Sequence, residues 1–242
     1  MFALDISKLE DPATAQPTFF DFINPLLVST LTHFPALKEV IERFASVPIR
    51  NQATLGGNIA NASPIGDMPP VLLALDAKIV LDNGETERTI ALKEFYVDYK
   101  KTTLAANEWI QAIQIPLLSD NQLLRVYKIS KRMEDDISAV CVALCLQVDE
   151  GKISALKTGF GGVAATPISC ELLESSLLGK TWHDHSNVDI GKQILNDAFS
   201  PIDDVRASAN YRKLMLQNLW HRFWLETNNS QNAIATRVVN HA

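Results

Sequence analysis

A stretch of small residues, from Ile49 to Asp67, limits what this chain can fold into more than any other segment. It holds few charges and the pair Gly56-Gly57, whose missing Cβ atoms predict positive φ angles and close approach of a ligand. Thr54 and Asn58 add short neutral side chains that donate and accept hydrogen bonds. Peptide N–H groups placed in this way can form an anion-binding concavity, and a simple turn between a strand and a helix is the alternative interpretation.

Two helices are predicted to flank this stretch. Before it, Pro35 suits the first helical position, and four apolar residues then form one helical face: Leu37, Val40, Ile41 and Phe44. After it, Asp67 is expected to N-cap an apolar helix from Met68 to Leu75, with Pro69 and Pro70 in the first turn.

The complete string is more specific than its glycines. The segments 49–51, 53–59 and 62–67 closely resemble the FAD-binding domain of molybdenum hydroxylases. That family includes the small subunit of bacterial xanthine dehydrogenase and the flavoprotein subunit of carbon monoxide dehydrogenase. The resemblance covers about His33 to Leu225, and it implies an FAD-dependent oxidoreductase component.

The resemblance also implies which residues lie near the cofactor. The implied FAD-binding set is Phe44, Thr54, Leu55, Gly56, Gly57, Asn58, Asp67, Ile110 (through its main chain) and Lys128. Arg132 and Asp135 lie in an implied loop on the nicotinamide side of the ring, and the segment 99–102 matches one that ends near the ring. Judged from residue type alone, Phe44 is a core aromatic, Lys128 is a surface lysine and the segment 99–102 is a solvated bend. No side chain needs to act as a nucleophile, so no catalytic residue is predicted.

Alternating patterns predict the strands and the fold class. Asn83-Gly84 predicts a hairpin between strands 77–82 and 85–90, and further strands are expected at 109–115, 123–130, 138–148 and 153–160. Three helices should follow: one N-capped by Thr166, one over 187–199 and one over 207–226. The glycines at 161 and 162 are interpreted as packing glycines. The predicted class is α+β: the second half of a two-subdomain FAD-binding fold, then a small antiparallel sheet with a C-terminal helical layer.

The expected divisions are an irregular N-terminal arm (1–32), a partial FAD-binding domain (33–118), a C-terminal subdomain (123–226) and a frayed tail (227–242). In related proteins an earlier subdomain grips the FAD pyrophosphate with a glycine-rich loop, and an iron–sulfur domain precedes it. Neither is expected in this chain. Because each 1.4 kcal/mol lost is a tenfold weaker Kd, the loss of these contacts is expected to weaken FAD retention, to the point where the chain folds without FAD in one of the interpretations below.

Composition excludes several other classes. The net charge of −6 and the pI of about 5.4 argue against a nucleic-acid surface. No apolar run reaches the roughly 18 residues of a membrane span, and no secretory signal is predicted. Cys141, Cys145 and Cys170 lack the spacing of a zinc or iron–sulfur site, which favours a cytoplasmic protein. His183 and His185 form a pair without a third metal ligand, so no metal site is predicted.

Three functions are compatible with these observations. The first is an FAD-binding component that relays electrons from iron–sulfur centres to NAD+ or oxygen, with a molybdenum-cofactor subunit and an iron–sulfur domain or subunit as partners. The second is a truncated, cofactor-free fold that only contacts other subunits. The third is a stand-alone FAD-dependent oxidase, which would be expected to carry its own pyrophosphate loop.

Overall fold

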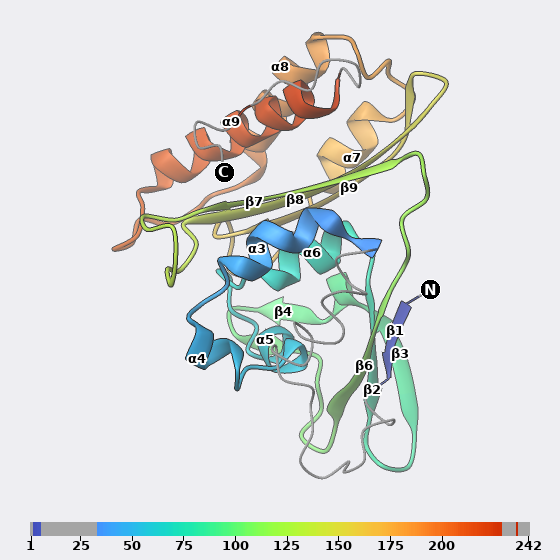
Figure 1. Cartoon of the computed structure of the whole chain (residues 1–242), viewed down its shortest axis with the longest axis vertical. Coiled ribbons are helices and arrows are strands. Elements are labelled where there is room, and N and C mark those ends of the chain that lie inside the picture. The colour runs from blue at the N-terminus through green and yellow to red at the C-terminus, as the bar shows by residue number, and fades with distance from the viewer. Residues whose placement is uncertain (1, 6–32, 229–235, 237–242) are drawn as a thin grey trace.

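The computed structural model describes residues 2–5, 33–228 and 236, which form two larger antiparallel sheets with helices between and outside them (Figure 1). A small two-stranded sheet pairs Tyr96–Asp98 with Lys101–Thr102. The elements in chain order are β1 (Phe2–Asp5), η2 (Pro35–Leu37), α3 (Lys38–Glu42), α4 (Val47–Arg50), α5 (Leu55–Ala60), α6 (Met68–Ala74), β2 (Lys78–Asp82), β3 (Glu87–Ala91), η3 (Leu92–Glu94), β4 (Tyr96–Asp98), β5 (Lys101–Thr102), β6 (Trp109–Ile115), β7 (Gln122–Ile129), β8 (Val140–Asp149), β9 (Lys152–Gly161), α7 (Glu171–Leu177), α8 (Ser186–Ala198) and α9 (Ala209–Thr227).

The first sheet has the strand order β1-β6-β2-β3. The predicted hairpin between β2 and β3 is confirmed: Gly84 has a φ of +86°, and the Asn83 side chain accepts hydrogen bonds from the amides of Glu85 and Thr86. β1 pairs antiparallel with β6. The segment 1–32, predicted to be irregular, therefore contains a strand at residues 2–5, and residues 6–32 lie outside the described part of the chain.

The second sheet, β7-β8-β9, lies between two helical layers (Figure 1). α3 and α6 cover one face, and α7, α8 and α9 cover the other. Leu124 and Val126 of β7 pack in the core on the α6 side, whereas Tyr127 belongs to the core on the α9 side. β8 is buried on both faces along most of its length, as its continuous apolar run predicts.

α6 approaches β9 so closely that the two main chains touch. A Cβ atom placed on Gly159 would lie 1.8 Å from the carbonyl oxygen of Pro70, so no larger residue fits there. A Cβ atom on Gly161 would lie 3.0 Å from the Pro70 ring. The packing role predicted for the glycines at this end of β9 is confirmed. Because α6 is held against the sheet, Asp67 at its start faces β7 and β8.

The helices differ from the prediction in where they begin. The helix expected from Pro35 is divided into η2 and α3. α7 begins at Glu171 and has no cap at Thr166, because Ile168 first exchanges main-chain hydrogen bonds of 2.8 and 3.0 Å with Phe160 of β9. Gly179 follows α7 with a φ of +75°, as expected.

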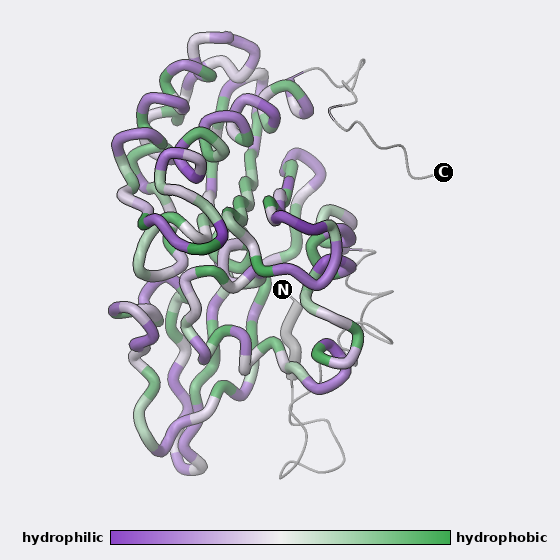
Figure 2. Tube along the Cα trace, turned by 90° about the vertical axis from the view of Figure 1, so that its left-hand side faces the viewer, coloured by the Kyte–Doolittle hydropathy of each residue, from purple (hydrophilic) through white to green (hydrophobic). Residues whose placement is uncertain are grey.

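The first two turns of α9 bury a charged side chain and expose apolar ones. Tyr211 and Leu214 are 43% and 51% exposed. Arg212 is buried instead, together with Leu216, Leu219, Trp220, Phe223 and Trp224. Hydrophilic and hydrophobic segments alternate along these C-terminal helices (Figure 2). The burial of Arg212 is possible because main-chain carbonyl groups accept hydrogen bonds from its guanidinium.

Candidate functional site

The glycine pair lies inside helix α5. Neither glycine has a positive φ, so the predicted turn-like backbone is wrong. Thr54 is the N-cap of α5, and its hydroxyl accepts a 2.8 Å hydrogen bond from the Gly57 amide. A Cβ atom on Gly57 would crowd that hydroxyl at 2.8 Å. The amides of Leu55 and Gly56, in the first turn, have no acceptor within the helix and point out of its N-terminus.

Arg50 fixes the bend between α3 and α4. Its Nη1 atom donates to the carbonyl oxygens of Phe44 at 2.6 Å and Ala45 at 2.8 Å, and Ala45 has a φ of +44°. The Phe44 side chain is 8% exposed and belongs to the core on the α6 side. Leu55 lies in the same core. The arginine of this sequence motif therefore has a structural role within the chain.

Three buried oxygen atoms in the first half have no hydrogen-bond partner: Asn58 Oδ1 in α5, Tyr96 Oη in β4 and Gln111 Oε1 in β6. α5 packs against β6. Buried polar atoms are normally satisfied, so an unsatisfied acceptor is compatible with a site completed by another molecule. Asn58 is the only predicted cofactor residue among the three.

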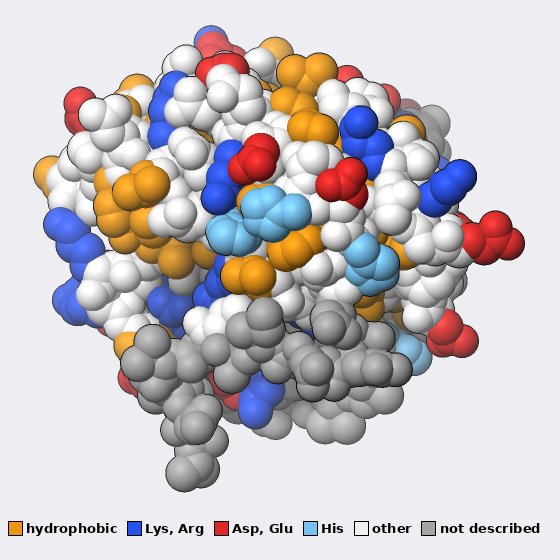
Figure 3. Space-filling view, turned by 90° about the horizontal axis from the view of Figure 1, so that it is seen from above, with side chains coloured by type: hydrophobic (Ala, Val, Ile, Leu, Met, Phe, Trp, Pro, Cys, Tyr) orange, Lys and Arg blue, Asp and Glu red, His pale blue; other side chains and the backbone are white. Residues whose placement is uncertain are grey.

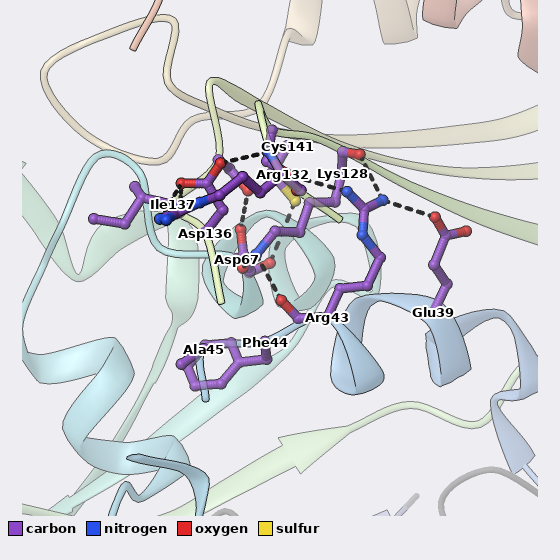
Figure 4. Close-up of polar contacts among 12 residues, drawn as sticks. Glu39, Arg43, Phe44, Ala45, Asp67, Lys128, Arg132, Asp136, Ile137 and Cys141 are labelled. Atoms are coloured by element: carbon purple, nitrogen blue, oxygen red, sulfur yellow. Dashed lines mark hydrogen bonds and ion pairs between the residues drawn. The ribbon is translucent and has the colours of Figure 1, made fainter. Parts of the chain in front are cut away.

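Asp67 and Lys128 form a buried ion pair between the two halves (Figure 4). Lys128 Nζ lies 2.7 Å from Asp67 Oδ2 and donates to the Arg43 carbonyl at 2.9 Å. The two side chains are 1% and 7% exposed. Ser138 donates to the other Asp67 oxygen. Asp67 occupies the N-cap position of α6 without a side-chain cap, and Lys128 is not a surface lysine.

Arg43 is a central residue that the sequence analysis missed. Its guanidinium donates to the carbonyl of Lys128 at 3.0 Å, the hydroxyl of Ser130 at 2.9 Å and the carbonyl of Met133 at 3.0 Å, and it pairs with Glu39 at 2.9 Å. Burial lowers its pKa, and the nearby Asp67 carboxylate opposes this shift. Arg43 thus connects α3 to the start of the loop after β7.

The loop over residues 130–138 carries the predicted pair Arg132 and Asp135. Arg132 donates to the Asp135 carbonyl at 3.3 Å and lies 3.5 Å from the Asp136 carboxylate. The Arg132 amide also donates to Asp136, which lowers the pKa of that carboxyl. Asp135 has a φ of +46°. The loop begins next to Lys128 and ends next to Ser138, so both of its ends adjoin the buried ion pair.

The other predicted contacts lie apart from this network. Ile110 is a buried residue of β6 beside a bulge in the pairing with β2. Tyr99 is 56% exposed, and Lys101 makes a surface pair with Asp98 at 3.1 Å. Lys100, with a φ of +52°, is the turn residue between β4 and β5, which pair antiparallel.

A groove of about 890 Å³ opens elsewhere, between η2–α3, β7 and α9. Its lining is mixed and includes Phe34, Tyr127, Met133 and Glu226. None of the nine predicted FAD-binding residues lines it. The size of this groove alone would therefore have suggested a ligand site away from the motif at residues 49–67.

Metal binding and membrane insertion find no support in the described residues. Histidine, cysteine and acidic side chains do not gather in threes there in a way that would hold a metal ion. Within the same residues no helix has the length and apolar character needed to cross a bilayer.

The histidines and cysteines have other surroundings. His183 lies 2.6 Å from Asn228, and His185 packs edge-on against Trp224; histidines are exposed on this helical face (Figure 3). The three cysteines are free and buried, and burial raises the pKa of each thiol.

Comparisons with known proteins give the class of this architecture. Residues 22–118 match the family described as FAD binding domain in molybdopterin dehydrogenase. Residues 125–227 match the CO dehydrogenase flavoprotein C-terminal domain. The gap between the two matches, residues 119–124, includes the start of β7, where the second sheet begins.

Individual relatives agree with this class. The chain is 35% identical to nicotinate hydroxylase hnxS of Emericella nidulans over 195 residues, which are 78% of this chain but 14% of that protein. It is 29% identical to the glyceraldehyde dehydrogenase medium chain of Sulfolobus acidocaldarius, over 90% of this chain and 80% of that one. Among solved structures, CO dehydrogenase from Oligotropha carboxidovorans superposes with a TM-score of 0.76 at 26% identity, over 85% of this chain and 70% of that one.

The chain belongs to the flavoprotein family of the molybdenum hydroxylases, which includes xanthine dehydrogenase and CO dehydrogenase. The predicted family and the predicted α+β fold class are both confirmed. The chain spans only about a seventh of the length of the large relatives such as nicotinate hydroxylase, and most of the length of the medium-chain relative.

Proposed function

We propose that this chain is the FAD-binding component of a xanthine dehydrogenase-like molybdenum hydroxylase. Its partners in this proposal are a molybdenum-cofactor subunit and an iron–sulfur domain or subunit. The observation that carries the proposal is the unpartnered, buried Asn58 Oδ1 in α5, within the segment that matches an FAD-binding family.

The residues present fit FAD in their hydrogen-bonding chemistry. The first-turn amides of Leu55 and Gly56 are donors, which suits carbonyl or phosphate oxygens of the cofactor. Asn58 Oδ1 and Gln111 Oε1 are acceptors, which suits ribityl hydroxyl groups or a ring N–H. Thr54 stabilises the N-terminus of α5, because its hydroxyl accepts the hydrogen bond from the Gly57 amide.

The chemistry supplied by bound FAD is the pairing of electrons that arrive singly from iron–sulfur centres, and their transfer to NAD+ or dioxygen. The chain contributes position and polarity. The Asp67–Lys128 pair holds β7 against α6, and it fixes both ends of the loop that carries Arg132 and Asp135. In this proposal that loop faces the electron acceptor, and its charges favour or disfavour an incoming dinucleotide.

FAD retention tests the proposal directly. The purified chain is incubated with FAD, excess cofactor is removed by gel filtration, and absorbance is recorded between about 350 and 500 nm, where oxidised flavin absorbs. We expect a retained flavin band. Substituting Asn58→Leu removes the acceptor and should abolish the band, whereas the matched change Gln193→Leu, on the outer surface of α8, should leave it intact.

Two results would count against the proposal. A colourless protein that still melts cooperatively would favour the cofactor-free fold that only contacts other subunits. A flavin band that survives Asn58→Leu unchanged would mean that FAD is held elsewhere. Replacing Arg132 or Asp135 by alanine in FAD-loaded protein should change the rate with NADH, which would test the assignment of the loop.

A further inference from the structure

The loop over residues 130–138 is held at both ends by one structural unit of the C-terminal half. At its start, Lys131 Nζ donates to the Val205 carbonyl at 2.8 Å. At its end, the Arg212 guanidinium donates to the carbonyl of Ala139. Val205 lies in the turn over residues 203–207, and Arg212 is bound to that same turn through Asp204 at 2.6 Å. The loop, the turn and Arg212 therefore form a closed ring of contacts.

Asp204 organises the turn. One of its carboxylate oxygens accepts hydrogen bonds from the amides of Arg206 at 2.8 Å and Ala207 at 3.0 Å, in addition to the Arg212 guanidinium. The Asp204 amide donates to the Ala207 carbonyl at 3.1 Å. A single oxygen thus fixes both the shape of the turn and the position of the arginine. If that oxygen lost its charge, the two would be uncoupled.

Arg212 also connects the ring to the glycine-rich segment. Its Nη1 atom donates to the Gly162 carbonyl at 3.0 Å, and the Gly162 amide donates to the Pro64 carbonyl at 2.7 Å. Gly162 has a φ of +83°, and a Cβ atom there would lie 2.3 Å from the Ala139 carbonyl oxygen. The Arg212 side chain is 2% exposed, and its Nε atom is buried without a partner. A buried charge is costly, so its retention here needs a reason beyond filling the core.

We propose that Asp204 and Arg212 are positioning residues that set the conformation of the loop 130–138 and, through it, the choice of electron acceptor. The role of these two residues in setting the loop conformation is supported by the contacts of Lys131, Asp204 and Arg212. The statement about the acceptor rests on the proposed function, because it requires FAD beside that loop. On the other side the loop is bound by Arg43 and by Asp67 through Ser138, so the ring determines how the exposed stretch between these anchors is presented.

Amide hydrogen exchange of the chain tests the first statement without any cofactor. Asp204→Asn keeps the shape of the side chain but removes its charge, and Lys131→Met removes only the contact to Val205 from an exposed position. Each should accelerate exchange at residues 131–137 roughly tenfold, the size expected for losing one charge-assisted hydrogen bond, and leave β8 unchanged. Trypsin cleavage at Lys131 and Arg132 should accelerate in Asp204→Asn as well. Lys180→Met, the same change at a distant surface lysine, should affect neither.

The second statement is tested on FAD-loaded protein. The measured quantity is the ratio of two rates: bleaching of the flavin band at about 450 nm by NADH, and its return with dioxygen. We expect Asp204→Asn and Lys131→Met to change this ratio, and Lys131→Arg to restore it. Unchanged exchange at 131–137 would overturn the proposal. Faster exchange with the same acceptor ratio as Lys180→Met would overturn the link to the acceptor. Failure of the parent chain to retain FAD would reject the proposed function and that link with it, while the exchange result would still decide the role of the ring.

Discussion

The buried pair of Lys128 and Asp67 yields the sharpest stability prediction. Lys128→Met keeps most of the apolar stem but removes the ammonium group, which lies 2.7 Å from the Asp67 carboxylate and 2.9 Å from the Arg43 carbonyl. The carboxylate would remain buried with the Ser138 hydroxyl as its remaining side-chain partner. Removing one partner of a buried ion pair costs about 3–5 kcal/mol, because an uncompensated charge is left in the core.

This loss is large compared with the roughly 5–15 kcal/mol by which a domain is stable. The double variant Lys128→Met with Asp67→Leu should recover most of it, since a buried ion pair replaced by apolar side chains is often neutral in stability. The pair therefore predicts a strongly non-additive double-mutant cycle. A non-additive result would show that the two side chains interact directly, and not that each position is separately sensitive.

Urea unfolding, followed by far-ultraviolet circular dichroism, gives the required free energies. Lys38→Met is the matched control: Lys38 pairs with Glu42, and these side chains are 67% and 62% exposed, so no measurable change is expected. A loss below about 1 kcal/mol for Lys128→Met, the range of exposed pairs, would refute the buried geometry. Additive losses in the double variant would refute the direct pairing.

Two further predictions concern packing and pH. Gly159→Ala should destabilise the chain by about 1–3 kcal/mol or more in urea unfolding, since a Cβ atom would overlap the Pro70 carbonyl. Gly66→Ala would place a Cβ atom at an ordinary contact distance of 3.4 Å from the Pro69 ring and should cost less, so equal losses would contradict the α6–β9 contact. The hydrogen bond from Arg88 holds the pKa of Glu108 at about 2, so its stabilisation is complete above the ordinary value of 4.5 and is lost as pH falls towards 2. Glu108→Gln should flatten this part of the profile of melting temperature against pH, and an unchanged acid slope would contradict the assignment.

Local sequence patterns predicted those parts of the fold that depend on neighbouring residues. The hairpin at Asn83-Gly84 was predictable because the turn needs a residue with positive φ at a fixed place. The strand β8 was predictable because its apolar run matches burial on both faces of a sheet. The start of α7 was not predictable, because Ile168 pairs with Phe160 in a bridge that no local signal marks.

The burial of Lys128 depends on a distant residue and could not be predicted from local sequence patterns. Alternation placed Lys128 correctly on the face of β7 that also carries Leu124 and Val126. A lysine at such a position normally reaches solvent, and here it does not because Asp67 is brought to it from 61 residues away. The cap predicted for Asp67 failed for the same reason, since its carboxylate is used by Lys128 and Ser138.

Arg43 and Arg212 were missed because most of their acceptors are main-chain carbonyl groups distant in sequence, which leave no residue-type signal. One local clue existed for Arg212. It lies four, seven and eleven residues before Leu216, Leu219 and Phe223, so it shares their helical face. A charged residue in register with a fully apolar stripe is a candidate for a buried anchor, and that rule would have found it.

The polar residues of the motif from Ile49 to Asp67 fall into two groups, those with a bonding partner within the chain and those without one. Arg50 holds the bend before α4, Thr54 caps α5, and Asp67 joins the buried ion pair, so each is explained within the chain. Asn58 differs, because its buried oxygen has no partner in the structure. Selection for folding alone accounts for the first three but would not favour an unsatisfied polar atom in the core. Any ligand specificity of this motif should therefore be concentrated in Asn58 and the free amides at the start of α5, and substitutions there should affect cofactor retention more than stability.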